Sequence, residues 1–142
     1  MRRKIAIYAR QSVDKKDSMS IETQIELCMN FINTNPEHDP VEVYSDKGYS
    51  GKNTVRPDFQ RLLTDVREDR ISKIVVYKLD RISRNLLDFV SMYQEFENHK
   101  VEFGSVNETF DTSTATGRSM LKISMIFAEM ERETIQMRVR DN

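Results

Sequence analysis

Strand-like apolar runs alternate with helical patterns along residues 4–106, and this alternation restricts the fold more than any other feature of the sequence. Buried strands are indicated at residues 4–10, 41–44, 72–78 and 101–106. Between them, helical spacing of apolar residues predicts helices at 20–33, from Pro57 onward and at 86–98. Strands separated by helices of this length predict an α/β fold with a mainly parallel four- to five-stranded sheet flanked by helices.

The composition fits a single globular domain. The chain has 142 residues, of which 38% are apolar and 32% charged, and it contains neither a membrane-length apolar window nor a signal-peptide core. Its only cysteine, Cys28, lies in a helical pattern, which excludes an internal disulfide and indicates a reduced core residue in a cytoplasmic protein. Because the net charge is −1, a nucleic-acid partner has to be held by local clusters of cations.

The final segment departs from this alternation. We divide the chain into a core, residues 1–115, and one long helix, 116–142, which shows no capping signal after Val139, so we expect it to be cut within the helix. The helix carries two apolar stripes. The first comprises Met120, Ile123, Phe127, Met130, Thr134 and Met137, and the second comprises Leu121, Met125, Ala128, Ile135 and Val139. One stripe is expected to cover the core and the other to meet a partner, as in a coiled-coil seam; the alternative is a helix buried on both sides.

Cations gather where the predicted strands end. The first strand ends at Arg10 and Ser12, whose side chains share one face. The second ends at Asp46, before Lys47, Lys52 and Arg56, and the third is followed by Lys78, Asp80, Arg81 and Arg84. Ligands of open α/β sheets bind beyond the carboxyl ends of the strands. A serine among arginines, without a nearby histidine, indicates chemistry on a phosphodiester, because guanidinium groups bind phosphate oxygens and stabilise transition-state charge.

Other assignments remain open at this stage. Tyr8 is a possible nucleophile, although a tyrosine in a buried strand is more often a packing residue. Asp80 is compatible with orienting an arginine, acting on a proton or capping a turn. Glu131 and Arg132 read as an exposed helical pair. Asp46, Glu108 and Asp111 together are a weak candidate for a divalent metal site.

Several motifs together resemble the catalytic domain of serine recombinases, the resolvase/invertase group, and most closely the large serine recombinases and transposon integrases. Tyr8-Ala9-Arg10-Gln11-Ser12 resembles the nucleophile motif, Gln24 the glutamine of the first helix, and Asp46-Lys47-Gly48-Tyr49-Ser50-Gly51 with Arg56 the arginine-bearing loop. Leu79-Asp80-Arg81-Ile82-Ser83-Arg84 matches the L-D-R-x-x-R motif, and Glu131-Arg132 the E-R motif of the long helix. At Asp65, where small resolvases have a lysine, the pattern is not matched.

The resemblance implies a mechanism and partners. Ser12 attacks a DNA phosphate and forms a 5′-phosphoserine link, while Arg10, Arg56, Arg81 and Arg84 surround the phosphate, and Tyr8, Gln24, Asp80, Glu131 and Arg132 complete or support the site. Strands are exchanged by rotation of subunits, so double-stranded DNA is the substrate and the chain forms a homo-dimer and homo-tetramer through Met120, Ile123, Phe127, Met130 and Met137. Neither a metal nor a cofactor is implied. The family's DNA-binding region is absent, so weak, unselective DNA binding is expected.

Two alternatives to this enzyme stay open. One is an oligomerisation module of a DNA-rearranging assembly, which the second apolar stripe favours. The other is a metal-dependent nuclease that uses Asp46, Glu108 and Asp111.

Overall fold

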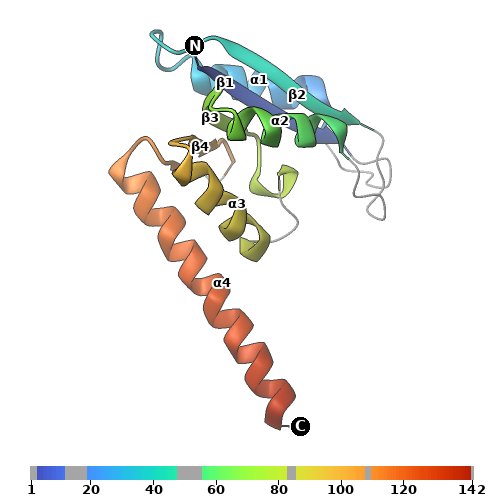
Figure 1. Cartoon of the computed structure of the whole chain (residues 1–142), viewed down its shortest axis with the longest axis vertical. Coiled ribbons are helices and arrows are strands. Elements are labelled where there is room, and N and C mark those ends of the chain that lie inside the picture. Colours follow the sequence, from blue (N-terminus) through green and yellow to red (C-terminus); the bar gives the residue numbers. More distant parts are fainter. Residues whose placement is uncertain (1–2, 12–18, 48–55, 83–85, 108–109, 142) are drawn as a thin grey trace.

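The protein is a five-stranded sheet with helices on both faces and one long helix at its carboxyl end (Figure 1). The computed structural model describes residues 3–11, 19–47, 56–82, 86–107 and 110–141. In chain order the elements are β1 (Lys4–Gln11), α1 (Ile21–Ile32), β2 (Val41–Lys47), α2 (Pro57–Arg67), β3 (Ile71–Val76), the short 3-10 helix η1 (Leu79–Arg81), α3 (Leu86–Asn98), β4 (Glu102–Ser105), β5 (Phe110–Asp111) and α4 (Ala115–Asp141).

The strands lie in the order β2-β1-β3-β4-β5, and all neighbours are parallel except β4 and β5. The predicted fold class is therefore confirmed. The short antiparallel strand β5 has no apolar run of its own and was not expected. Its backbone is held by β4, and the Thr112 hydroxyl just beyond it accepts a hydrogen bond of 2.7 Å from the Phe103 N–H.

The boundaries of β2 and β3 differ from the prediction. β2 continues through Ser45, Asp46 and Lys47, because these polar residues pair with Ala9, Arg10 and Gln11 of β1. β3 instead ends at Val76, two residues early, and the chain then turns into η1. As a result β1 and β2 project beyond β3 at the carboxyl edge of the sheet.

Each face of the sheet has its own apolar layer. On one face α1 packs Cys28 and Ile32 against Ile5, Ile7 and Val75. On the other face α2 and α3 form the larger cluster, which includes Tyr8, Phe59, Phe89 and Phe103. Cys28 is fully buried, as expected, and burial raises the pKa of its thiol to about 12, so the thiol stays protonated.

α4 has 27 residues and, at about 1.5 Å per residue, a length of about 40 Å. It begins beside β5, passes α3 and then extends away from the sheet (Figure 1). Its start is fixed at Gly117, where a Cβ atom would lie 1.9 Å from the Asp111 carbonyl oxygen. Only glycine permits this approach. No helix in the described part of the chain is both long enough and apolar enough to cross a bilayer.

Candidate active site

Arginines from three separate segments lie at the carboxyl edge of the sheet. Arg10 is near the end of β1 and pairs across the strands with Asp46 of β2. Arg81 ends η1, directly after β3, and is only 8% exposed. Arg56 immediately precedes α2 and is half-buried. The structure thus brings together the three of the four predicted arginines that it describes.

Some predicted site residues lie outside the described residues. These are Ser12 and Arg84, together with the side chains of Asp80, Arg132 and Met137. The backbone of Asp80 forms part of η1, and that of Arg132 part of α4. The roles assigned to these residues remain predictions.

Arg56 is held by aromatic rings and a backbone carbonyl. Its guanidinium carbon lies 4.0 Å from the ring centroid of Phe59 and 5.9 Å from that of Tyr8. Its Nη1 donates a long hydrogen bond, 3.5 Å, to the carbonyl oxygen of Arg81. The ring faces attract the cation without neutralising it, and the hydrogen bond links Arg56 to the segment that carries Arg81.

Gln24 acts as a substitute strand partner for Arg10. Pairing of β1 with β3 ends at Tyr8 and Val76, two residues before Arg10. The fully buried Gln24 amide fills this place: Oε1 accepts from the Arg10 N–H at 3.3 Å and Nε2 donates to the Arg10 carbonyl at 2.9 Å. Nε2 also donates to the Met19 carbonyl at 2.9 Å. One side chain therefore holds the backbone on both sides of the segment that contains Ser12.

Tyr8 is a packing and hydrogen-bonding residue. Its hydroxyl is buried and donates to Asp46 Oδ2 at 2.8 Å. Burial raises the pKa of Tyr8 far above its usual range; the nearby Arg56 lowers it by less than burial raises it, and the hydrogen bond to Asp46 raises it again. A phenol that stays protonated is a poor nucleophile, so the packing interpretation is favoured over the nucleophilic one.

On α4, the described members of the two predicted stripes behave differently. The first is exposed, with Ile123 54% and Phe127 62% accessible, whereas Leu121 of the second is 1% exposed and packs in the core. Met120 and Met130 are also exposed. The alternative of a helix buried on both sides is therefore wrong for this part of α4. Glu131 is exposed too, at a position where the chain has left the sheet.

The metal-site alternative gains no support. Asp46 lies on β2 and Asp111 on β5, at opposite edges of the sheet with three strands between them. Glu108 is outside the described residues. Within the described ranges, no group of histidine, cysteine, aspartate and glutamate side chains is arranged to hold a metal ion.

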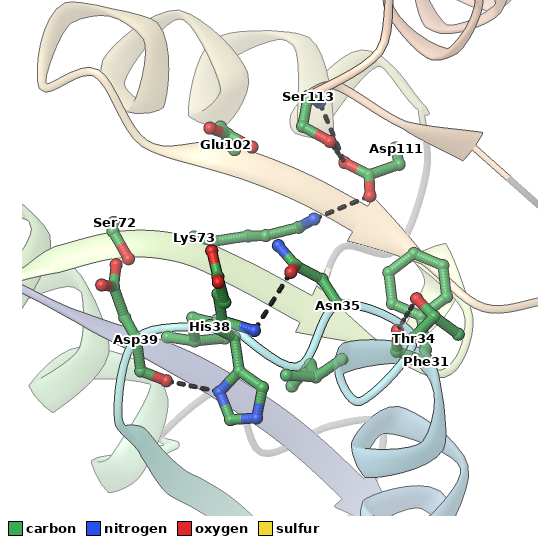
Figure 2. A pocket seen from close by; sticks show the side chains of 13 residues that line it. Phe31, Thr34, Asn35, His38, Asp39, Ser72, Lys73, Glu102, Asp111 and Ser113 are labelled. Carbon is green, nitrogen blue, oxygen red and sulfur yellow. Dashed lines mark hydrogen bonds and ion pairs between the residues drawn. The ribbon is translucent and has the colours of Figure 1, made fainter.

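Figure 2 shows a cleft of about 330 Å³, lined in part by Ile5, Ser72 and Lys73 near the beginnings of β1 and β3, whereas the arginines follow the opposite ends of the strands. Lys73, near the beginning of β3, donates to Asp111 at 2.7 Å within it, and Asp111 also accepts from the Ser113 N–H and hydroxyl. The Lys73 amine lies 5.5 Å from the centroid of the Phe31 ring. These contacts fasten the start of α4 to the sheet, and none of the arginines takes part.

The sequence predicted Asp46 at the end of the second strand and as a weak metal ligand, but did not predict its hydrogen bonds to the next helix. Asp46 accepts hydrogen bonds from the backbone N–H groups of Asp58 and Phe59, both 3.0 Å, at the start of α2. A signal for this exists in the sequence. The helix beginning at Pro57 has an arginine, Arg56, at its N-cap, which cannot accept these hydrogen bonds, so an acceptor from elsewhere is required.

Comparisons with known proteins show which family the chain resembles. The family model described as "Resolvase, N terminal domain" matches residues 5–142. A DNA-invertase of Enterobacteria phage P7 is 37% identical over 98 residues, which cover 69% of this chain and 51% of that protein. The Transposon Tn917 resolvase of Enterococcus faecalis is 30% identical, with 90% of this chain and 62% of that protein covered. The chain thus spans about half to three-fifths of the length of these curated relatives.

Solved structures show the same fold. The N-terminal catalytic domain of TP901-1 integrase is similar with a TM-score of 0.78 and 36% identity, covering 93% of this chain and 98% of that one. A resolvase family site-specific recombinase from Streptococcus pneumoniae has a TM-score of 0.78 at 29% identity, covering 99% and 95%.

Proposed function

Because this chain belongs to the family of resolvase N-terminal domains, we propose that it is the catalytic domain of a site-specific recombinase that cuts and rejoins double-stranded DNA. The observation that carries the proposal is the meeting of Arg10, Arg56 and Arg81 at the carboxyl edge of the sheet. Such a group of guanidinium ions suits a phosphodiester, whose charge increases in the transition state.

The reaction is a pair of transesterifications. Ser12 Oγ attacks the scissile phosphorus, the bond to the 3′ oxygen breaks, and a 5′-phosphoserine and a free 3′-hydroxyl result. The serine proton leaves as the bond forms, and the 3′ oxygen takes up a proton as it departs. In the reverse step a 3′-hydroxyl attacks the phosphoserine, so the bond energy is retained and no external energy source is required.

The arginines share one part in this reaction, and other residues support them. Arg10, Arg56, Arg81 and Arg84 bind the non-bridging oxygens, and their charge also favours the ionised form of Ser12. Asp80, Glu131 and Arg132 support the site. Gln24 supports it through the Arg10 backbone, which it bonds at 3.3 Å and 2.9 Å.

Assembly belongs to the same function. The exposed stripe of Met120, Ile123, Phe127 and Met130 follows the 3,4 spacing of a helix–helix seam. Its occupant in our proposal is the same stripe of a second copy, extended by Met137, in a dimer and then a tetramer on DNA. The substitution Phe127→Glu should weaken self-association in sedimentation. The control Glu129→Gln, which lies outside the stripe, should leave self-association unchanged. Unchanged association of Phe127→Glu would exclude this seam.

The test of the chemistry is to trap the protein–DNA link. The full-length protein is incubated with duplex DNA that carries its recombination site, denatured, and digested for mass spectrometry. We expect the adduct on Ser12. It should be lost in Ser12→Ala but should still form in Tyr8→Phe, and in the wild type when a chelator is present. An adduct on Tyr8, or an undiminished adduct in Ser12→Ala, contradicts the proposal.

A further inference from the structure

Asp46 joins three elements next to the arginines. The residue is only 3% exposed, and its carboxylate accepts hydrogen bonds from the Tyr8 hydroxyl of β1 and from the Asp58 and Phe59 N–H groups of α2. Asp46 itself ends β2 together with Lys47. A single buried carboxylate thus fastens the first turn of α2 to the ends of two strands, and its charge faces the positive end of the helix.

β2 and α2 each donate hydrogen bonds to the other. Asp58, in the first turn of α2, accepts a hydrogen bond of 2.9 Å from the Ser45 N–H of β2. Ser45 and Asp46 therefore hold the same helical turn through one donor and one acceptor. These hydrogen bonds fix the position of this turn relative to the sheet, in addition to the apolar packing of α2.

Arg56 depends on that turn. It is the N-cap residue of α2, and its guanidinium rests 4.0 Å from the ring centroid of Phe59, whose own N–H is bonded to Asp46. The other ring beneath it, that of Tyr8, is bonded to Asp46 through the hydroxyl. Both residues whose rings contact the Arg56 guanidinium are thus hydrogen-bonded to the carboxylate of Asp46.

We propose that Asp46 is a positioning residue for Arg56, holding the guanidinium where it meets the scissile phosphate. The inference rests on the proposed recombinase function for its catalytic consequence and on the contacts of Asp46 for the positioning itself. Asp46 does not touch the substrate in this account; it acts through the start of α2.

The chain contains a matched control. Tyr44 of β2 donates its hydroxyl to Asp65 of α2, a second buried tyrosine–aspartate pair between the same sheet face and the same helix. Asp65 lies near the carboxyl end of α2, away from Arg56, and its other partners are Lys4 and Arg70. Asp65→Asn therefore disturbs the same helix without disturbing its first turn.

The first measurement follows Arg56 directly, without DNA. In the chain labelled with ¹⁵N-arginine, we expect the Arg56 Nε–H resonance to be shifted upfield, because the guanidinium stacks on Phe59. We expect Asp46→Asn, which places an amide NH₂ against N–H donors, to move this resonance toward the free-arginine position. Tyr8→Phe keeps the ring and removes one donor, so it should move the resonance less, in the same direction. An unchanged Arg56 resonance in both folded variants overturns the proposal.

The second measurement tests coupling in the full-length protein. In single-turnover trapping on recombination-site DNA, Asp46→Asn should form the Ser12 adduct about tenfold to 100-fold more slowly at saturating protein, as expected for a misplaced catalytic group. In an Arg56→Lys background the same substitution should have almost no further effect, while Asp65→Asn leaves the rate unchanged in both backgrounds. An equal fold-loss from Asp46→Asn in both backgrounds overturns the proposal.

The two measurements separate this inference from the function on which it rests. If wild-type protein forms no Ser12 adduct, the recombinase proposal fails, and the Arg56 resonance still decides whether Asp46 positions that side chain. If the adduct forms and the Arg56 resonance is the same in Asp46→Asn as in the wild type, only the positioning role of Asp46 is refuted.

Discussion

Replacing Gln24 by leucine tests whether one amide holds the end of β1. The substitution keeps the approximate size of a fully buried side chain and removes its hydrogen bonds to the Arg10 N–H, the Arg10 carbonyl and the Met19 carbonyl. Since each hydrogen bond contributes about 1 kcal/mol net, the loss of all three should lower the free energy of unfolding by about 3 kcal/mol. Domains of this kind have about 5–15 kcal/mol in total, so the variant should still fold.

Urea unfolding followed by circular dichroism measures this loss. With a slope of about 2 kcal/mol/M, a loss of about 3 kcal/mol moves the midpoint down by about 1.5 M. The control is Gln60→Leu on α2, where the glutamine is exposed and the change should stay within about 0.5 kcal/mol. Gln24→Glu keeps an acceptor for the Arg10 N–H but turns an oxygen toward two carbonyls, so we expect it to lose at least as much as leucine does.

The outcome also bears on the serine. Because Gln24 holds residues on both sides of Ser12, Gln24→Leu should slow Ser12 adduct formation more than its stability loss explains, under conditions where the variant is fully folded. A loss below about 1 kcal/mol, less than a single one of these hydrogen bonds is worth, would refute the strand-partner role of the amide.

Three further predictions concern the start of α4. Gly117→Ala should cost about 3 kcal/mol or more in thermal or urea unfolding, because its Cβ would lie 1.9 Å from a backbone oxygen of Asp111. Burial raises the pKa of Asp111, but hydrogen bonds from Lys73 and Ser113 lower it by more, so its folded pKa is depressed. The stabilisation that its ionised form supplies is therefore complete above the ordinary pKa of about 3.9 and is lost as pH falls through the folded value. The stability difference between wild type and Asp111→Asn should shrink over that range. Leu121→Ala should cost about 2–5 kcal/mol and Ile123→Ala under about 0.5 kcal/mol in the same assay on dilute, monomeric protein, because within one chain only Leu121 is buried.

The sheet could be predicted from the sequence because its strands are apolar runs with clear helical patterns between them. β5 could not, because two residues held by β4 leave no periodic signal. The same contrast applies to the site. Arg10, Arg56 and Arg81 follow strand ends or precede a helix, so topology alone brings them together. The partners of Gln24 and Asp46 depend on where β3 stops and where α2 begins, and both are tertiary features.

The way Arg56 is held explains how a chain of net charge −1 can keep a cationic site. Several arginines elsewhere on the surface are paired with carboxylates, as in Arg67 with Glu95 at 2.6 Å and Arg70 with Glu68 at 3.2 Å. In the described part of the chain, Arg56 forms no such ion pair and instead contacts aromatic rings and a carbonyl.

The nearby carboxylate of Asp46 accepts from two backbone N–H groups and a phenol, and these three neutral donors occupy most of the lone pairs that an arginine would otherwise bind. The Arg56 guanidinium is therefore fixed in place and keeps the charge with which, in the proposed reaction, it binds a phosphate.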